Sequence, residues 1–368
     1  MVYNTIVVGG GAIGCIASAK AVEDGDVLLI EEHTRQPVHC AGLISISGLE
    51  KLGIKPGDWV ENRANGAYIY SPLGTRIEVL TNKPKALVVD RSKFDRALLD
   101  RALARGVELE TGKVKNIGDK EIQLYSKKSI SLPDRVILAT GTEFELQKKL
   151  GANYPKEVLI GAQYEMKIEV EPEIVELHFV VPDFFAWIIP VDDYARIGCA
   201  TKGNPTPYLE NFIRKLRRDR RVKSSRIRQR VYGVIPIHNP KLRTLYEKNF
   251  SLLLVGDTAS HVKATTGGGV VMGGIAAQQV ISQNYETAWR EEIGGELKKH
   301  LYIYRLLHSL TPKNLDRLFQ ILAKHHNIIE EYGDMDYASK LLAGFFHSPK
   351  FFLDILSKLP FFFMDMIL

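Results

Sequence analysis

The chain has 368 residues, of which 45% are hydrophobic and 25% are charged, and its formal net charge is +6. This composition is typical of a globular protein, and the length suffices for one large core or for two to three lobes. Three cysteines without zinc spacing exclude a disulfide framework, and the absence of a signal peptide or a ~20-residue apolar run predicts a cytoplasmic protein that does not span a membrane.

The chain opens with a pattern typical of a βαβ unit. Residues 5–8, Thr-Ile-Val-Val, predict a buried strand that a glycine run follows. Small and apolar residues then alternate to about residue 22, as in a helix packed tightly on a sheet. Residues 27–30 predict a second buried strand, which ends in Glu31 and Glu32.

The glycines of this unit have the spacing G-x-G-x-x-G. Gly9 permits a tight turn, Gly11 lets the backbone approach a pyrophosphate at the helix N-terminus, and Gly14 allows close contact between helix and strand. Glu31 follows the second strand, where a carboxylate accepts hydrogen bonds from a ribose hydroxyl. Strand, glycines, helix, strand and acid in this order predict a dinucleotide site.

Two further segments have the same character. Residues 135–141 predict a strand that ends in a small-residue turn, and residues 251–259 predict a third strand that ends in Gly256 and Asp257. A glycine-rich helix start follows at residues 267–269. Such an arrangement offers a carboxylate to ribityl hydroxyls and helix N–H groups to a diphosphate or a flavin oxygen.

Strand-like and aromatic segments lie between these nucleotide segments. Residues 64–85, 158–170 and 175–181 predict strands, which we expect to form an antiparallel sheet over the cofactor. In the segment FFAWIIP, residues 184–190, Phe185 and Trp187 share one face of a strand. We expect them to line an apolar pocket, with core packing as the alternative.

The positive charge is concentrated in one place. Residues 214–230 carry ten Lys/Arg and one Asp, so the remainder of the chain is slightly acidic. We interpret this segment as a basic helix. Nucleic acid, an anionic membrane surface or a phosphorylated substrate can bind such a segment, and a solvated helix face is the alternative.

Residues 286–368 predict helices, and their end is rich in phenylalanine. Seven of the fifteen phenylalanines occur between Phe345 and Phe363. A helical cap packed on the body or on a second subunit is one interpretation, and an apolar surface that meets lipid chains or a membrane interface is the other.

The three nucleotide segments together resemble the FAD-binding fold of the glutathione-reductase and p-hydroxybenzoate-hydroxylase type, and Arg91, which opens a helix after a strand, resembles that group's arginine-bearing segment. A closer resemblance is to the geranylgeranyl reductase family, especially its archaeal members. It is carried by EEHTRQPVHCAGLIS (31–45), FFAWIIP, GVIPI (233–237) and GDTASHVKATTGGGVVMG (256–273). Phe185 stands where that family commonly has tyrosine, and nothing beyond residue 290 matches a motif.

The resemblance implies an α/β fold: a Rossmann-like FAD-binding domain of the glutathione-reductase type, an antiparallel-sheet substrate domain and a helical C-terminal region. We expect residues 1–63, 86–150 and 249–285 to form the first, 64–85 and 151–248 the second, and 286–368 the third. Together, the patterns and the resemblance predict FAD contacts from Gly9, Gly11, Ala12, Ile13, Gly14, Glu31, Glu32, Cys40, Ala41, Gly42, Arg91, Ala139, Thr140, Gly141, Gly256, Asp257, Gly267, Gly268, Gly269 and Val270.

The implied activity is FAD-dependent reduction of isolated C=C bonds in geranylgeranyl chains of archaeal membrane-lipid precursors. An unactivated alkene accepts hydride poorly, so the site must be apolar and must supply one proton. Cys40 is the implied catalytic residue, as proton donor or as a modulator of the flavin, and a small buried thiol is the alternative. Cys15 and Cys199 are interpreted as packing residues.

The implied substrate contacts are Phe185, Trp187, Pro190 and His261, although a structural role is the alternative for His261. His39 could titrate near neutrality but need not face the site. The implied partners are a prenylated lipid or prenyl diphosphate and an external donor, NADPH, ferredoxin or deazaflavin, with peripheral membrane contact, no nucleic acid and no metal. A quinone-tail reductase, an FAD-dependent monooxygenase and an electron-transfer flavoprotein remain alternatives.

Overall fold

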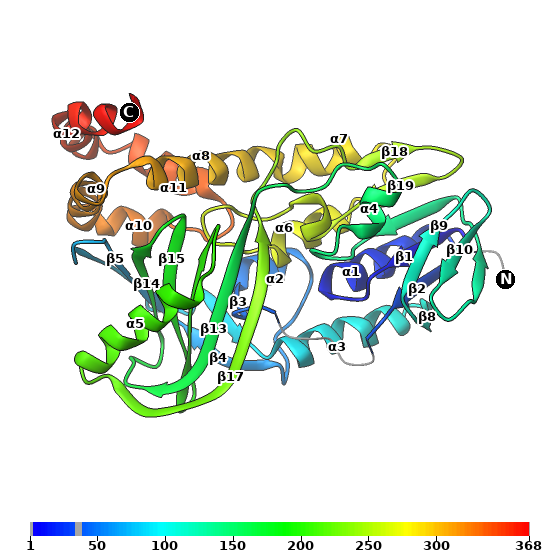
Figure 1. The fold of residues 1–368 in the computed structure, drawn as a ribbon. Coiled ribbons are helices and arrows are strands. Elements are labelled where there is room, and N and C mark those ends of the chain that lie inside the picture. The colour runs from blue at the N-terminus through cyan, green and yellow to red at the C-terminus, as the bar shows by residue number, and fades with distance from the viewer. Residues whose placement is uncertain (1–2, 34–38, 368) are drawn as a thin grey trace.

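The computed structural model of the protein describes residues 3–33 and 39–367. Its strands form four sheets, and helices cover them in an α/β arrangement (Figure 1). A six-stranded sheet lies toward one end of the molecule and a seven-stranded sheet toward the other, and helices of the C-terminal region extend along both.

The six-stranded sheet joins segments that are far apart in the sequence. Strand β1 pairs in parallel with β2 and β12, and β12 and β2 pair in parallel with β19 and β8. Runs of Val, Ile and Leu suit its central strands, which are buried on both faces. In spatial order the strands are β18 (Leu245–Glu247, antiparallel), β19 (Ser251–Leu254), β12 (Arg135–Leu138), β1 (Thr5–Val8), β2 (Val27–Glu31) and β8 (Glu108–Thr111).

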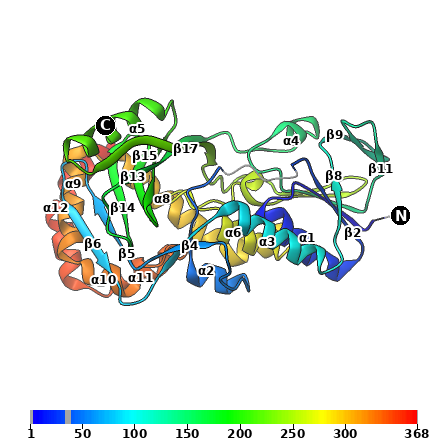
Figure 2. The same cartoon turned by 90° about the horizontal axis from the view of Figure 1, so that it is seen from below.

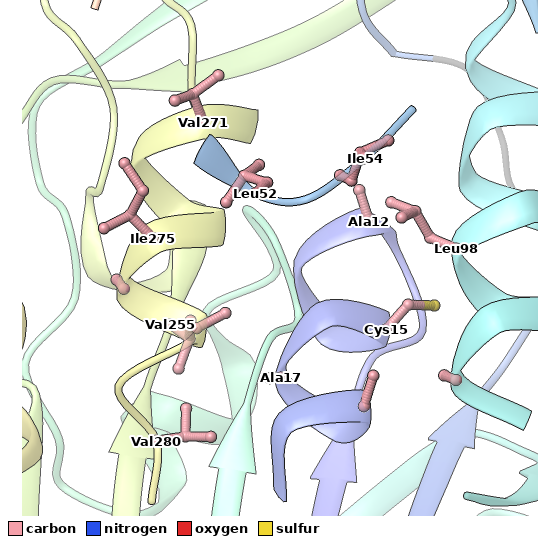
Figure 3. Close-up of a cluster of buried hydrophobic side chains, with 14 of the residues drawn as sticks. Ala12, Cys15, Ala17, Leu52, Ile54, Leu98, Val255, Val271, Ile275 and Val280 are labelled. Atoms are coloured by element: carbon pink, nitrogen blue, oxygen red, sulfur yellow. The ribbon is translucent and has the colours of Figure 1, made fainter. Parts of the chain in front are cut away.

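Three helices cover one face of this sheet. They are α1 (Ala12–Ala21), α3 (Arg91–Leu103) and α6 (Val270–Ala277), which lie next to each other in Figure 2. Small residues on α1 let the helices approach closely. Figure 3 shows Cys15 on α1 within this core, pointing toward α3, and it is fully buried, as a packing residue should be.

The opposite face is covered by α4 (Glu145–Lys149) and by a small antiparallel sheet of β9 (Val114–Ile117), β10 (Glu121–Leu124) and β11 (Ser129–Ser131). A second three-stranded sheet, of β3 (Leu43–Ser45), β7 (Ala86–Val89) and β4 (Val60–Ala64), precedes α3 along the chain, and α2 (Ile46–Lys51) follows β3. This sheet connects the two large sheets.

The seven-stranded sheet is antiparallel except where β14 meets β5. Its order is β17 (Val222–Pro236), β13 (Val158–Ile168), β16 (Tyr194–Thr201), β15 (Phe184–Val191), β14 (Ile174–Val181), β5 (Gly66–Tyr70) and β6 (Arg76–Leu80). Helix α5 (Thr206–Arg218) packs on one face. The other face carries an aromatic core that also includes Ala64, Ala86 and Val88 of the three-stranded sheet.

The chain ends in a helical region. It comprises α7 (Tyr285–Trp289), a π-helical turn (Arg290–Gly294), α8 (Gly295–Ser309), α9 (Pro312–Lys324), α10 (His326–Tyr332), α11 (Ala338–Phe346) and α12 (Pro349–Ile367). In Figure 2 the helices α9 to α12 stack beside β5 and β6. Within the described part of the chain, no helix combines the length and the apolar character that crossing a bilayer requires.

The predicted strands at residues 5–8, 27–30, 135–138 and 251–254 and the helices beyond residue 286 are confirmed. The predicted basic helix is wrong in its second half, because α5 ends at Arg218 and the chain continues as the edge strand β17. Arg226, Arg228 and Arg230 alternate along that strand, and the Arg228 guanidinium lies 4.3 Å from the ring centre of Tyr194. Strand pairing with β13 and this stacking therefore prevail over local helix propensity.

Candidate cofactor and substrate site

The turn between β1 and α1 needs glycine at two positions and leaves space at a third. Gly9 has a φ of +101°, and a Cβ on Gly14 would lie 1.8 Å from the Gly9 carbonyl oxygen. Gly11 has extended backbone, and no described atom lies within 4 Å of where its Cβ would be. Helix α1 therefore packs directly on the turn and presents its N-terminus to open space, as an anion site requires.

The other glycine-containing turns lie beside it because their strands are parallel neighbours. The Ala139 N–H donates to the Val8 carbonyl (2.9 Å), and the Val255 N–H donates to the Leu138 carbonyl (3.0 Å). The turns after β1, β12 and β19 therefore leave the sheet at one edge. This places at that edge the predicted residues Ala12, Ile13, Ala139, Thr140, Gly141, Gly256 and Asp257.

The two glutamates after β2 have different surroundings. Glu31 is buried, and its carboxylate accepts the N–H groups of Gly10 (2.5 Å) and His33 (2.7 Å). These bonds fix the carboxylate beside the glycine turn and leave lone pairs for further donors. Glu32 instead forms an ion pair with Lys113 at 2.9 Å. Of the two glutamates, Glu31 is therefore better placed to accept a hydrogen bond from a ribose hydroxyl.

The Asp257 carboxylate accepts no hydrogen bond from a described residue. Asp257 follows β19 in the sequence, and in space it lies next to Gly269, the residue before α6. A Cβ on Gly269 would lie 2.7 Å from Asp257 Oδ1. Burial disfavours its charge, and Arg91 offsets this only in part, so the pKa of Asp257 is raised to about 6. An unsatisfied carboxylate of this kind is suited to hydroxyl donors on a ligand.

The raised pKa predicts a stability cost at neutral pH. The ordinary value is 3.8, so the folded protein binds this proton more tightly than the unfolded chain, and stability falls as the pH rises from about 4 to about 6. Asp257→Asn, which has no charge, should make the cofactor-free protein more stable than the parent at neutral pH. Thermal unfolding across this range should show the difference shrinking toward pH ~4. A variant less stable than the parent at neutral pH would contradict the assignment.

The Cys40 segment, residues 39–42, contacts the seven-stranded sheet and the three-stranded sheet of β3, β7 and β4; Pro37 and Val38 lie outside the described residues. The His39 ring is hydrogen-bonded to the Tyr232 carbonyl of β17 (2.7 Å), and the Gly42 carbonyl accepts the Val89 N–H (2.8 Å). His39 is exposed, whereas Cys40 is half-buried. Cys40 therefore lies between a contact to β17 of the seven-stranded sheet and a contact to β7 of the three-stranded sheet.

Arg91, at the first turn of α3, joins Cys40 to the cofactor edge. Its guanidinium binds the Asp95 carboxylate through two bonds of 2.9 and 3.0 Å. Burial opposes the charge of Arg91, but Asp95 and the Cys40 sulfur outweigh it, so the pKa of Arg91 is raised. Arg91 also acts on Asp257. Arg91 is therefore close enough to both the Cys40 sulfur and the Asp257 carboxylate to interact with them electrostatically.

Arg196 is a functional candidate that the sequence analysis missed. It is buried on β16, and its Nη1 donates to the carbonyls of Ala41 (2.9 Å) and Val89 (3.0 Å). Its remaining donors bind Glu165 and Glu61. Arg196 thus holds the Cys40 segment in place. A single arginine within the otherwise apolar strand YARIGCAT was the signal that could have revealed it.

The aromatic residues of β15 form a cluster next to the Cys40 segment. Phe185 and Trp187 lie on one face of the sheet, as predicted, and their ring centres are 6.3 Å apart. Trp187 Nε1 donates to Gln163 (3.0 Å). Ala41 packs against the same core, and Phe184 approaches the loop 263–269, here called the cofactor loop. The aromatic cluster (Phe179, Phe184, Phe185 and Trp187) therefore borders both predicted cofactor segments.

Two predicted substrate residues are not brought together with this cluster. Alternation along β15 places Pro190 on the face of Ala186 and Ile188, which packs against α5. His261 is fully buried against Trp289, with ring centres 4.4 Å apart, and burial holds its pKa well below the ordinary value. Pro190 and His261 are therefore absent from the aromatic cluster.

A cavity of about 590 Å³ lies elsewhere, between α1, α3 and the segment after α6. Its walls include Cys15 and the cations Lys20, Arg101 and Arg105, and none of the predicted cofactor or substrate residues lines it. Lys20 is paired with Glu23, and both arginines bind backbone carbonyls. The cavity therefore lacks the convergent, unsatisfied polar groups that distinguish the strand edge.

The residues at the strand edge suit a nucleotide cofactor. The open space over Gly11 admits a phosphate group at a helix N-terminus, and Asp257 offers an unpartnered acceptor for hydroxyls. Gly267, with a φ of +68°, makes a turn near the end of the cofactor loop, just before α6. Gly268, Gly269 and Val270 follow at the start of that helix. The Gly268 N–H donates to the Thr266 hydroxyl (3.3 Å), and the first N–H groups of α6 itself have no helical partner and can bind an anion.

Comparisons with known proteins agree with this geometry. No family model matches the chain. The uncharacterized protein MJ1520 of Methanocaldococcus jannaschii is 33% identical over 92% of this chain and 93% of its own length. A digeranylgeranylglycerophospholipid reductase of the same organism is 29% identical over 88% and 91%. A geranylgeranyl bacteriochlorophyll reductase-like structure from Thermoplasma acidophilum matches with a TM-score of 0.79 at 21% identity, over 97% and 99%.

Proposed function

Because the chain belongs to the geranylgeranyl reductase family, we propose that it is a flavin-dependent reductase of isolated C=C bonds in geranylgeranyl chains of archaeal membrane-lipid precursors. The observation that carries the proposal is the position of Cys40, which is next in sequence to Ala41 of the aromatic core and is a neighbour of Arg91. An apolar wall, one proton source and a nucleotide site are what alkene reduction requires.

The cofactor is FAD, bound by a domain of the glutathione-reductase type. Residues 1–63, 86–150 and 249–285 form this domain, 64–85 and 151–248 form the substrate domain, and 286–368 form the helical region. The first turn of α1 holds the diphosphate, Glu31 holds the adenosine ribose, and Asp257 accepts from the ribityl chain. When bound and reduced, the flavin supplies the hydride.

The chain's own residues supply the other requirements. Phe185 and Trp187 exclude water and hold the prenyl chain, and Gln163 fixes the indole of Trp187. The Cys40 thiol donates its proton to the alkene carbon that does not receive hydride. The adjacent Arg91 guanidinium can donate a hydrogen bond to the sulfur once the proton has left it.

An external reductant must regenerate the reduced cofactor, because no second G-x-G-x-x-G pattern is evident in the sequence. The candidate reductants are NADPH, ferredoxin and a deazaflavin. The basic residues Arg226, Arg228 and Arg230 lie on β17, the strand whose Tyr232 carbonyl contacts His39, and they suit a phosphate on the substrate. Arg221 is not among them, because it binds Glu176 and Glu169.

Anaerobic turnover tests the proposal directly. The purified protein is reduced with dithionite and mixed with a digeranylgeranyl glycerophospholipid. Reoxidation of the flavin with addition of two hydrogens per double bond, read by mass spectrometry, is the expected result. Oxygen-dependent NADPH consumption with an aromatic substrate would instead identify a monooxygenase. Flavin reduction without turnover of any prenyl substrate would identify an electron carrier, and turnover of only prenyl quinones would identify the quinone-tail reductase.

The C-terminal helices give the enzyme a surface for its lipid. Phe351, Ile355 and Phe362 of α12 pack inward, as the cap interpretation expects. The outward side is nevertheless apolar: Phe346 is 69% exposed and Leu353 is 67% exposed. In the sequence, Lys350 precedes Leu353 and Lys358 follows Leu356. We propose that this surface rests on a lipid membrane from which the substrate enters.

The triple variant Phe346→Ser, Leu353→Ser, Leu356→Ser should bind anionic lipid vesicles at least about tenfold more weakly than the parent. The reason is that three apolar side chains that the parent buries in the membrane are replaced by polar ones. Its melting temperature should be unchanged, since these side chains are exposed. Vesicle sedimentation measures the binding, and Tyr125→Ser, exposed at a distant turn, is the matched control. If the parent protein binds no vesicles but forms a dimer that the triple variant does not form, the surface is a contact with a second subunit.

A further inference from the structure

Asp336, in the segment between α10 and α11, is fully buried and binds two distant parts of the chain. One carboxylate oxygen pairs with Lys263 Nζ at 2.5 Å, and the other accepts the hydroxyl of Ser45. Lys263 is itself 4% exposed. A buried carboxylate therefore joins the C-terminal region to two segments of the candidate site.

Lys263 closes the cofactor loop. Its N–H donates to the Gly268 carbonyl (3.1 Å), and its own carbonyl accepts the Gly267 N–H (2.8 Å). A Cβ on Gly268 would lie 2.9 Å from the Lys263 Cε, so the lysine side chain runs directly beneath the loop backbone. The position of the Lys263 ammonium therefore determines the position of the loop.

His300, on α8, makes a second connection to the same loop. Its Nε2 lies 3.1 Å from the Asp336 carbonyl, and its Nδ1 lies 2.6 Å from the Thr265 hydroxyl. A carbonyl only accepts, so Nε2 carries the proton and Nδ1 accepts from Thr265. Burial and the Lys263 charge lower the pKa of His300 to about 4, which keeps the ring in this neutral form.

Ser45 connects Asp336 to the Cys40 segment. It ends β3, three residues after Gly42, and its Oγ accepts the Gly48 N–H (3.1 Å) at the start of α2. A Cβ on Gly48 would lie 2.8 Å from Asp336 Oδ2. The same carboxylate thus contacts the strand that leads away from Cys40 and the lysine that supports the cofactor loop.

We propose that Asp336 and His300 are positioning residues of the cofactor site: through Lys263, Thr265 and Ser45 they hold the cofactor loop and the Cys40 segment in register. This inference rests on the proposed function, since it gives the loop a flavin to face. It also assigns a role to the C-terminal region, which carries no recognisable motif.

The chemistry of the tether favours positioning over simple stabilisation. A buried ion pair loses much of its attraction to the cost of removing both charges from water, and a well-packed apolar pair often stabilises a fold equally well. What the ion pair adds is a fixed geometry, because the bonds to Lys263 and Ser45 are directional.

The double variant Lys263→Met, Asp336→Leu tests the proposal without leaving a buried charge unpaired. FAD affinity is measured by quenching of flavin fluorescence, the reduction potential by dye equilibration, and folding by thermal unfolding. We expect a melting temperature close to that of the parent, FAD binding weaker by about tenfold or more, and a shifted potential. Parent-like affinity and potential in the folded variant would overturn the proposal.

Two further variants complete the test. Asp316→Leu removes a matched contact, because this buried aspartate on α9 accepts the hydroxyl of Ser71, which directly follows β5. It should lower the melting temperature without changing FAD affinity. If the double variant does not fold, Thr265→Val removes only the bond to His300 and should weaken FAD binding by about threefold; unchanged binding overturns the proposal. A parent protein that binds no FAD would instead refute the proposed function.

Discussion

Replacing Cys40 with serine is expected to slow alkene reduction by about 10²-fold or more while FAD stays bound. A hydroxyl is a far weaker acid than a thiol, and Arg91 beside it would gain no comparable anion to stabilise. The serine is of similar size and the position is half-buried, so the fold should tolerate the change. The rate of flavin reoxidation by a prenyl lipid in a single anaerobic turnover is the measurement.

Cys199→Ser is the matched control for this experiment. Cys199 is fully buried on β16 in the core that packs against α5, and its sulfur donates only to the Pro205 carbonyl. The same chemical change there should cost some stability and leave the single-turnover rate of the folded protein unchanged. If Cys40→Ser retains both FAD and the parent rate, the thiol has no part in proton transfer.

Gly11→Ala is expected to leave the cofactor-free fold intact and to weaken FAD binding by about 10²-fold or more. Gly11 has a φ of −66° and a ψ of 179°, which any residue adopts, and its Cβ would meet no described atom within 4 Å. The added methyl group therefore costs the protein little by itself. It instead occupies the space through which the diphosphate approaches the first turn of α1.

Two other glycines separate the cofactor effect from a packing effect. Gly203→Ala also adds a methyl group in open space, but far from the strand edge, and should change neither FAD affinity nor melting temperature. Gly14→Ala should destabilise the protein itself, because its Cβ would lie 1.8 Å from the Gly9 carbonyl oxygen. Titration with FAD and thermal unfolding of the cofactor-free proteins give both quantities. Parent-like FAD affinity in Gly11→Ala would place the diphosphate elsewhere.

The parts of the site that local sequence pattern controls were the ones that could be predicted. The turn at Gly9, Gly11 and Gly14 and the turn at Asp257 follow buried strands, and parallel pairing brings such turns to one edge regardless of the residues between them. The shared face of Phe185 and Trp187 follows from the two-residue period of a strand.

Other parts depend on contacts that no local pattern encodes. Lys263 and Asp336 are 73 residues apart, and neither is distinguished from an ordinary surface residue by its neighbours in the sequence. The second half of the basic segment forms a strand although its charge resembles that of a solvated helix, because its spacing and not its charge determines the structure. Arg226, Arg228 and Arg230 are spaced by two, which is a strand signal, and Arg220, with a φ of +59°, makes the turn before it.

The order of strands in the six-stranded sheet has a consequence for synthesis of the protein. Thr5 on β1 pairs with Arg135 on β12, which in turn pairs with Ser251 on β19. A growing polypeptide therefore cannot close this sheet until about two thirds of it has left the ribosome, and its early hydrophobic strands wait for late partners. High contact order of this kind slows folding, so we expect the nascent chain to depend on chaperones for most of its elongation.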